Sequence, residues 1–251
     1  MAHDWNAASY DQVADDLTRW GGNVVSWLRL RGDERVLDAG CGSGRVTAQL
    51  LERLPNGQVV ALDGSADMLT EARRRLVRAV EEKRLELIQA DLRAPLPLEQ
   101  PVDAILSTAT FHWLPDHAAL YRQLAAVLTP GGQLAAQYGG VGNIARVRKA
   151  IDAAWPLDDA WPGPWNFSAP EQARTYLADA GFVDVEAWLK DEPIPFEERP
   201  AMETYLETVV LGAHLERLAP EQRKPFVARV AAGIDPPVLD YVRLNVVARR
   251  G

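Results

Sequence analysis

Three glycines alternate with other residues directly after an aspartate near the start of the chain. Asp38 precedes Gly40, Gly42 and Gly44, and a helical pattern begins immediately after the last of them. Glycine permits a positive φ in a tight turn and lets the backbone approach a ligand closely. The carboxylate of Asp38 would repel a pyrophosphate, whereas it would attract a ligand with a cationic end. The loop therefore indicates a binding site for a ligand that carries positive charge.

Two further aspartates follow the next two predicted strands. Asp63 comes directly after the stretch 58–62, and Asp91 lies behind 85–89. In a doubly wound sheet the carboxyl ends of such strands converge on one crevice, so we expect both acids to meet Asp38 there. An acid at the end of the second strand is placed to accept hydrogen bonds from ribose hydroxyls, in NAD and in other nucleosides alike.

The elements that must position these acids alternate between apolar runs and amphipathic helical runs, which is typical of an α/β protein with a mostly parallel sheet. Gly21-Gly22 is expected to split the first helical segment. A tight turn is expected at 129–132, and Pro220 and Pro225 are expected to interrupt later helices. The predicted strands cover residues 34–38, 58–62, 85–89, 102–106, 133–138, 182–189 and 238–248, and the first predicted helices cover 8–29, 43–54 and 65–82.

The glycine run resembles the first motif of class I S-adenosylmethionine (SAM)-dependent methyltransferases, D-x-G-x-G-x-G. The stretch 107–117, S-T-A-T-F-H-W-L-P-D-H, resembles the trans-aconitate methyltransferase group. The resemblance covers most of residues 4–140 and the last strand, and it is weak from 141 to 235. Further matches lie at both ends of the chain, in Asp4-Trp5-Asn6, Tyr10, Arg243-Leu244 and 247–250.

This resemblance implies a Rossmann-like, seven-stranded, mostly parallel sheet with helices on both faces. It implies a single methyltransferase domain over residues 1–251, with an N-terminal helical cover at 1–30. A helical lid at 196–234 would be inserted between strands six and seven. The expected fold class is therefore α/β with an added helical lid.

The resemblance also implies SAM as the cofactor, with its amino-acid tail, ribose and adenine held by the three strand-end acids. An apolar residue after the second strand would pack on the adenine. The residues expected to contact the cofactor are Tyr10, Asp38, Gly40, Cys41, Gly42, Gly44, Asp63, Gly64, Met68, Ala90, Asp91, Leu92, Thr108 and Trp113.

Two positions depart from the pattern of the resembling group. His112 stands where a glutamine is usual before tryptophan, and Thr108 stands where an asparagine is usual. Both are expected where the methyl group meets its acceptor, so the substrate of the group is not carried over to this chain. His112 is the first candidate catalytic residue, as a base or as a hydrogen-bond donor, because histidine can do either near neutral pH. The alternative is a structural histidine at a strand end.

Aromatic and cationic residues later in the chain are candidates for binding the acceptor. An arginine would favour an acidic acceptor through bidentate contact, and a solvated surface arginine is the alternative. The tryptophan- and proline-rich stretch around Trp161 would wall a pocket, or it would be a surface loop held by its own aromatic residues. The candidates for substrate binding are Trp5, Tyr138, Arg146, Trp165, Tyr205, His214 and Arg243.

The composition narrows the class of partner. The formal net charge is −8 and the sequence pI is about 5.1, which argues against a nucleic-acid substrate. The single cysteine, Cys41, excludes an intramolecular disulfide and a multi-cysteine metal site, and it fits a reducing cytoplasm. The sequence indicates no signal peptide, no membrane span and no metal site. It leaves the oligomeric state open.

Three functions follow from these patterns. A SAM-dependent methyltransferase with a small-molecule acceptor leads; carboxyl O-methylation is favoured by the resemblance, and other O-, N- or C-acceptors stay open. The second is an NAD-dependent oxidoreductase on a similar fold. The sequence disfavours it because of Asp38, Asp91 and the short glycine spacing. A catalytically silent SAM-binding protein is the third.

Overall fold

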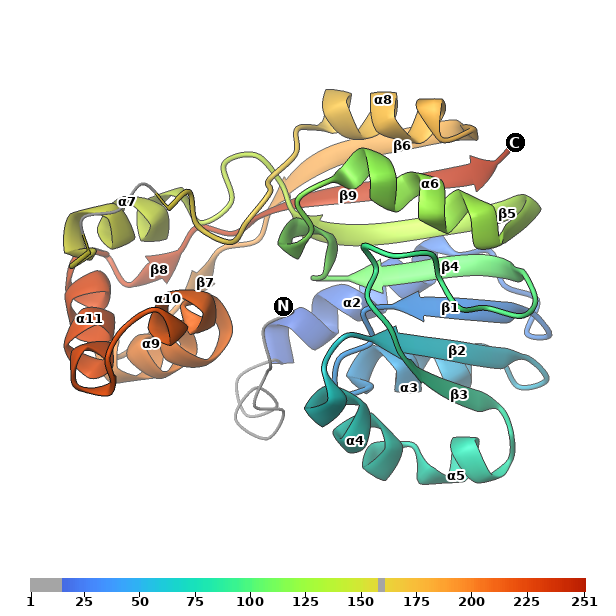
Figure 1. Ribbon diagram of the computed structural model, residues 1–251, viewed down its shortest axis with the longest axis horizontal. Coiled ribbons are helices and arrows are strands. Elements are labelled where there is room, and N and C mark those ends of the chain that lie inside the picture. The colour runs from blue at the N-terminus through green and yellow to red at the C-terminus, as the bar shows by residue number, and fades with distance from the viewer. Residues whose placement is uncertain (1–14, 158–160) are drawn as a thin grey trace.

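The computed structural model describes residues 15–157 and 161–251, so the expectations for Trp5 and Tyr10 fall outside the described residues. The strands of the main sheet are β1 (Arg35–Ala39), β2 (Gln58–Asp63), β3 (Leu85–Gln89), β4 (Val102–Thr108), β5 (Leu128–Gly139), β6 (Phe182–Asp191) and β9 (Val242–Arg250). Across the described residues they form one seven-stranded sheet in the order β3-β2-β1-β4-β5-β9-β6 (Figure 1). Strand β9 runs antiparallel to both of its neighbours, and the other pairs are parallel. The expected Rossmann-like, mostly parallel sheet is confirmed.

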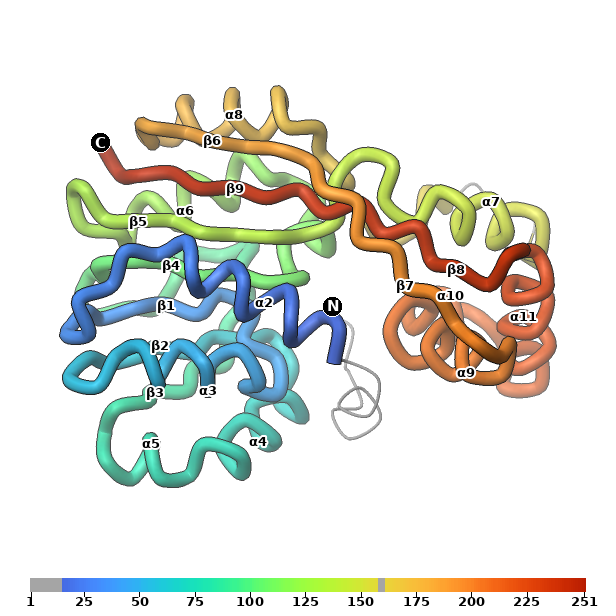
Figure 2. The backbone as a smooth tube through the Cα atoms, turned by 180° about the vertical axis from the view of Figure 1, so that it is seen from behind, coloured from blue at the N-terminus to red at the C-terminus, as the bar shows by residue number. Residues whose placement is uncertain are grey.

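Helices cover both faces of this sheet, as Figure 2 shows from the side of α2 and α3. Successive residues of a strand point to opposite faces, so a strand covered on both sides must be apolar throughout. In β1, Val36 packs with α2 and α3, and Leu37 packs with α6 and α8. One face carries α2 (Asp15–Trp27), α3 (Arg45–Glu52), α4 (Ala66–Arg75) and α5 (Val77–Glu81), and the other carries α6 (His117–Val127) and α8 (Pro170–Asp179).

A second group of helices lies beyond the carboxyl ends of β1, β2 and β4 (Figure 1). It has its own apolar core, in which Val147, Met202 and Phe226 are buried together. Trp20 of α2 belongs to this second core, so α2 connects the sheet with the helical group. The group consists of α7 (Ala145–Ala154), α9 (Arg199–Tyr205), the π-helical η2 (Leu206–Val210), α10 (Gly212–Glu216) and α11 (Pro220–Ala232), with the ribbon β7 (Ile194–Pro195) and β8 (Val238–Leu239).

Helix α2 runs unbroken through Gly21-Gly22, so the expected split there is wrong. The two glycines serve close packing instead of a turn. A Cβ at Gly21 would lie 2.4 Å from Cγ2 of Val46, and one at Gly22 would lie 2.5 Å from Oε1 of Gln49. Because no side chain stands in the way, α2 lies directly on α3, and packing overrides the low helix propensity of glycine.

Several element boundaries also differ from the expectations. The turn expected at 129–132 is a bulge within β5, where the pairing with β4 slips and Gly131 has a φ of 75°. The helix expected at 65–82 breaks into α4 and α5, and the strand expected at 238–248 becomes β8 and β9. Pro225 lies inside α11 without ending it, whereas Pro220 begins that helix, where a missing N–H costs no hydrogen bond.

Candidate active site

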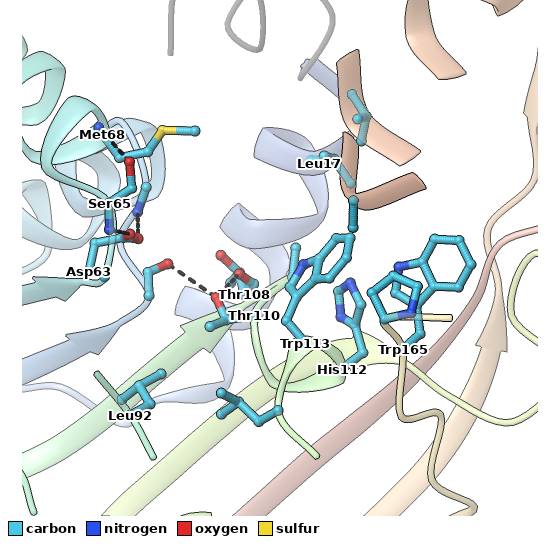
Figure 3. Close-up of a pocket in the computed structure, with 18 of the residues that line it drawn as sticks. Leu17, Asp63, Ser65, Met68, Leu92, Thr108, Thr110, His112, Trp113 and Trp165 are labelled. Carbon is cyan, nitrogen blue, oxygen red and sulfur yellow. Dashed lines mark hydrogen bonds between the residues drawn. The ribbon is translucent and has the colours of Figure 1, made fainter. Parts of the chain in front are cut away.

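A cavity of about 340 Å³ lies between the carboxyl ends of the parallel strands and the helical group. Figure 3 shows Asp63 and Met68 at one end of it and His112 and Trp165 at the other, with Thr108 between them. We call the first the glycine-loop end, which also contains Gly40, Gly42, Ala90, Asp91 and Leu92. We call the second the aromatic end, which also contains Trp113, Asn143, Ile144, Val209, Val210, Tyr241 and Arg243.

The glycine loop joins β1 to α3 with positive φ at all three of its glycines. A Cβ at Gly40 would lie 2.2 Å from Oγ1 of Thr110, so the loop can approach the end of β4 only with glycine at that position. The N–H groups of Gly40 and Cys41 both donate to the carbonyl of Leu62, at 2.8 and 3.0 Å. These bonds fix the loop over the end of β2 and leave Gly42 facing the cavity.

Asp63 is held in place by backbone donors on two sides. One carboxylate oxygen accepts from the N–H of Gly42 at 2.8 Å, and the other accepts from the N–H of Ser65 at 2.9 Å. Burial raises the pKa of this carboxyl, and the backbone N–H groups of Ser65, Gly42 and Gly64 oppose that rise. Each carboxylate oxygen can accept one further hydrogen bond. The carboxylate could therefore accept hydrogen bonds from two ribose hydroxyls.

Asp38 does not line the cavity but lies beneath the glycine loop, 1% exposed. Its carboxylate accepts a hydrogen bond of 2.7 Å from Oγ1 of Thr47. The pKa of Asp38 is raised to about 7, chiefly by burial and also by the charge of Asp63, although the Thr47 hydrogen bond opposes the rise. The glycine loop therefore separates Asp38 from the cavity.

Asp91 lines the cavity and is already paired. Its carboxylate binds Arg93 through both Nε, at 2.9 Å, and Nη2, at 2.5 Å. Arg93 lowers the pKa of Asp91, so this acid is ionised at neutral pH. Ala90, Leu92 and Met68 lie in the same part of the lining and give it an apolar surface.

Thr108 and Thr110 connect the two ends of the cavity (Figure 3). Thr110 Oγ1 lies 3.0 Å from the carbonyl of Thr108 and 3.2 Å from that of Gly40, to both of which it can donate. Ala109 between them has a φ of 56°, which is uncommon for a residue with a Cβ, and its N–H donates to Gln137 at 2.7 Å. This strained turn aims the short helix η1 (Phe111–Trp113) into the cavity.

His112 is buried, and one of its ring nitrogens has a backbone partner. Its Nδ1 accepts a hydrogen bond from the N–H of Gly139 at 3.3 Å. Burial holds the pKa of His112 well below its usual range, and the nearby charges of Arg243 and His117 lower it further. A neutral ring whose Nδ1 is an acceptor carries its proton on Nε2. In this arrangement Nε2 is the ring nitrogen that can donate a hydrogen bond, and His112 lines the cavity.

Arg243 brings a buried positive charge to the aromatic end of the cavity. The side chain is 2% exposed, and its guanidinium carbon lies 5.3 Å from the ring centre of Trp20 and 5.8 Å from that of Tyr241. Aromatic faces attract a cation, so these rings hold the guanidinium without neutralising its charge. Arg243 also lines the cavity.

Asn143 lies in the same part of the lining, although the sequence analysis did not select it. Its side-chain oxygen accepts from the N–H of Val242 at 2.9 Å, so the amide NH₂ is the group left for a ligand. The pair Gly139-Gly140 marks the point where the chain leaves β5, and that signal could have drawn attention to Asn143. Other lining residues that the analysis did not select include Leu17, Ser65, Thr110, Val209, Val210, Glu216 and Tyr241.

Several predicted residues lie outside the cavity lining. Tyr138 is buried beneath the sheet, where its hydroxyl lies 2.6 Å from that of Tyr121. Arg146 donates to backbone carbonyls of the β8 turn, including that of Val238. Tyr205 is buried in the helical core, with its hydroxyl 3.3 Å from that of Tyr241. Cys41 and Gly44 shape the glycine loop without lining the cavity.

His214 lies next to the lining residue Ala213, inside an aromatic cluster. Its ring packs 4.8 Å from that of Trp161 and 5.2 Å from that of Trp165. Burial, together with the charge of Arg217, lowers the pKa of His214 to about 4. His214 therefore supports the Trp165 wall of the cavity as a neutral ring. Of the tryptophans in that loop, Trp165 reaches the cavity.

Two negative findings concern the described residues alone. Within residues 15–157 and 161–251, no group of three or more His, Cys, Asp or Glu side chains could hold a metal ion. Over the same residues, no helix has the length and apolar character needed to cross a membrane.

The fold and the glycine loop are those of a class I SAM-dependent methyltransferase, and comparison with known proteins agrees. The profile of the methyltransferase domain family matches residues 36–132. A trans-aconitate 2-methyltransferase from Azoarcus sp. strain BH72 is 33% identical, over 96% of this chain and 94% of its own length. One from Methylobacterium nodulans is 42% identical, over 98% of both chains. The chain therefore belongs to the trans-aconitate 2-methyltransferase family.

A solved structure shows the same fold at low sequence identity. Geranyl diphosphate methyltransferase in complex with SAM has a TM-score of 0.59 and 16% identity, over 93% of this chain and 85% of that one. The resemblance inferred from the glycine motif is thus confirmed, as are the enzyme class and SAM as cofactor. The NAD-dependent alternative and the silent SAM-binding alternative are not favoured.

Proposed function

We propose that this enzyme transfers the methyl group of SAM to a carboxylate oxygen of a small molecule. One observation carries the proposal: at the aromatic end, the buried guanidinium of Arg243 lies beside His112, whose Nδ1 accepts from Gly139. These groups attract an anion and donate hydrogen bonds, but they supply no base. A carboxylate is an acceptor that needs no base. The names of the relatives, trans-aconitate 2-methyltransferases, support the same chemistry.

The glycine-loop end fits SAM on three counts. The atom nearest to a Cβ built at Gly42 is Met68 Sδ, at 4.0 Å, so the backbone there is open to a ligand. Asp63 offers acceptor capacity for the ribose, and Met68 and Leu92 offer an apolar surface for the adenine. Asp38 adds negative charge beneath the ammonium end. We propose these roles, together with adenine contact at Asp91, on the strength of that arrangement.

When bound, SAM supplies an electrophilic methyl group on a positively charged sulfur. The task of this chain is to hold the carboxylate in line with that methyl group and to exclude water. The sulfonium and the carboxylate lose their charges together in the reaction, so a poorly solvated cavity favours the step. Arg243 and His112 would hold the acceptor from the side away from the glycine loop, and Thr108 and Trp113 would border the transfer point (Figure 3).

The helices between β6 and β9 would close the cavity as a lid, and the segment 1–30 would cover it from the other side. The lid proposal is supported by Val209, Val210 and Ala213, which line the cavity from η2 and α10. The cover proposal is supported by Leu17 of α2, which lines it as well. We also propose a cytoplasmic location, since the one cysteine is a free, buried thiol.

A product assay tests the proposed function. The protein is incubated with SAM and, in separate reactions, with carboxylic acids, phenols and amines, and products are identified by mass. A methyl ester that alkali hydrolyses back to the acid supports the proposal. Methylation confined to phenols or amines would refute it. In the supporting case Arg243→Met should lose ester formation, while Arg122→Met, a change of an exposed arginine on α6, should retain it.

A further inference from the structure

Asn143 lies where the chain leaves β5, and its side chain takes part in the end of the β5–β9 ladder. The N–H of Gly140 donates to the carbonyl of Val242 at 3.0 Å. A regular antiparallel pair would return a bond from the N–H of Val242 to the carbonyl of Gly140. That N–H instead donates to Oδ1 of Asn143 at 2.9 Å, so the side-chain oxygen has a structural partner. This bond also assigns the other amide position to Nδ2.

The amide nitrogen of Asn143 is the part of the side chain that the sheet does not use. The residue is 2% exposed, and it lines the cavity. Within residues 15–157 and 161–251, Nδ2 has no hydrogen-bond partner, yet it retains accessible surface. A role in the sheet alone requires only an oxygen, which a hydroxyl or a carboxylate also supplies. The fold therefore does not account for the two N–H donors, and leaving donors unpaired in a closed site is unfavourable.

Gly139 makes room for this amide and places it near His112. A Cβ at Gly139 would lie 2.8 Å from Nδ2 of Asn143, so any side chain there would displace the amide. The N–H of Gly139 donates to Nδ1 of His112 at 3.3 Å, which leaves Nε2 as the ring nitrogen that can donate. Both side chains line the cavity. Two neutral groups with N–H donors thus lie against the same backbone residue at the end of β5.

We propose that Asn143 is an acceptor-binding residue, whose amide N–H donates a hydrogen bond to an oxygen of the methyl acceptor. This inference rests on the proposed function, under which that oxygen belongs to the carboxylate. Because the amide is uncharged, its hydrogen bond orients the carboxylate and leaves the negative charge on the oxygens. One oxygen would be held by Nδ2, and the other would be left in line with the methyl group.

Asn143→Asp separates the two roles of the side chain. Aspartate has nearly the same shape and keeps an oxygen for the N–H of Val242, whereas an ionised carboxylate has no donor for the acceptor. We expect kcat/KM for the best acid of the product assay to fall about 100-fold, and S-adenosylhomocysteine affinity to stay nearly unchanged. The deficit should shrink as the pH falls from 8 to 5.5, because protonation restores an O–H donor. A role in folding alone would not produce that recovery.

Two further variants support this measurement. Asn143→Ser removes the amide without adding a charge and should lose about tenfold in kcat/KM. It decides the question if Asn143→Asp does not fold. Asn56→Asp makes the same chemical change at an exposed turn before β2 and should leave kcat/KM unchanged. Calorimetry with the S-adenosylhomocysteine-loaded protein measures acceptor binding independently of turnover in each variant.

The possible failures are distinguishable. If Asn143→Asp and Asn143→Ser both keep the acceptor affinity and kcat/KM of the unchanged protein, Asn143 serves the sheet alone and the inference is overturned. Equal losses of acceptor affinity and S-adenosylhomocysteine affinity would overturn it too, because they indicate a general disturbance of the site. Neither result bears on the proposed function, which methyl ester formation by the unchanged protein tests. Methylation confined to phenols or amines would refute the proposed function, and the same variants measured on that acceptor would still support or overturn the role of Asn143.

Discussion

The two ends of the cavity are built in different ways. At the glycine-loop end, backbone groups do most of the positioning: the N–H groups of Gly42 and Ser65 hold Asp63, and Gly40 and Cys41 bind the carbonyl of Leu62. At the aromatic end, side chains from distant segments hold one another, as Arg243 does with the rings of Trp20 and Tyr241. Backbone positioning suits a ligand shared by a whole class of enzymes, whereas side-chain positioning can change from one relative to the next.

The largest effect should come from removing the charge at the aromatic end. We expect Arg243→Met to lower kcat/KM roughly 100- to 1000-fold, because a desolvated anion loses its partner. S-adenosylhomocysteine affinity, measured by calorimetry, should change less than threefold. Arg122→Met is the matched control. If Arg243→Met weakens cofactor binding as much as turnover, the two ends are not separate in function.

The next effect belongs to the glycine-loop end. Asp63→Ala should weaken S-adenosylhomocysteine binding by roughly 1–3 kcal/mol, because buried hydrogen bonds to the ribose are lost. The acceptor KM, measured at SAM concentrations that saturate the variant, should stay the same. Asp67→Ala, at an exposed acid of α4, serves as the control. Unchanged affinity in Asp63→Ala would exclude this carboxylate as the ribose acceptor.

A pH titration of cofactor binding tests the role of Asp38. The pKa of this acid is about 7 in the free protein, and the ammonium group of the ligand favours its ionised form, so we expect binding to lower that pKa. S-adenosylhomocysteine affinity should therefore rise, by up to about tenfold, as the pH rises from 6 to 8. Asp38→Asn removes this contribution, which separates it from titration of the ligand's own amino group. If affinity depends on pH in the same way in the unchanged protein and in Asp38→Asn, ligand binding does not shift the pKa of Asp38.

The smallest expected effect concerns the pH dependence of kcat/KM, to which His112 should contribute nothing. The pKa of His112 lies well below 6.5 because the ring is buried, so its charge should stay constant between pH 6 and 9. We expect His112→Gln, which keeps a donor, to retain most of kcat/KM and the shape of the pH–rate curve. His112→Ala should lose about tenfold. A rising limb near pH 6.5 that disappears in His112→Gln would instead identify a base.

The contrast between the two ends also explains what the sequence could predict. Gly42 and Asp63 could be placed because Gly42 follows the end of β1 within three residues and Asp63 ends β2, and strand ends meet in one crevice. The mostly parallel sheet with helices on both faces followed from the resemblance to class I methyltransferases. Asp38 was expected to meet the ligand directly, yet it lies under the loop, since side-chain direction at a strand end depends on how the loop folds over it.

The aromatic end was harder to predict because its residues are brought together by tertiary contacts. Tyr138 and Arg243 lie on neighbouring strands, where Tyr138 pairs with Leu244. Side chains of paired residues share a face, so Tyr138 packs beneath the sheet with Leu244, and Arg243 points to the opposite side, toward Trp20. A shift of one residue along a strand therefore decides whether a side chain packs in the core or faces the cavity. Asn143 lies in a loop, so no helix or strand periodicity in the sequence indicated its position.

The direct contact of α2 with α3 at Gly21-Gly22 has a mechanical consequence. Helix α3 starts at the glycine loop, and α2 carries Leu17 into the cavity and Trp20 beneath Arg243. A methyl group introduced at Gly21 would act as a wedge against Val46 and push the two helices apart. This displacement would move the glycine loop, which binds the methyl donor, and the α2 residues near the acceptor at the same time. A residue that contacts neither ligand would therefore disturb the alignment of both.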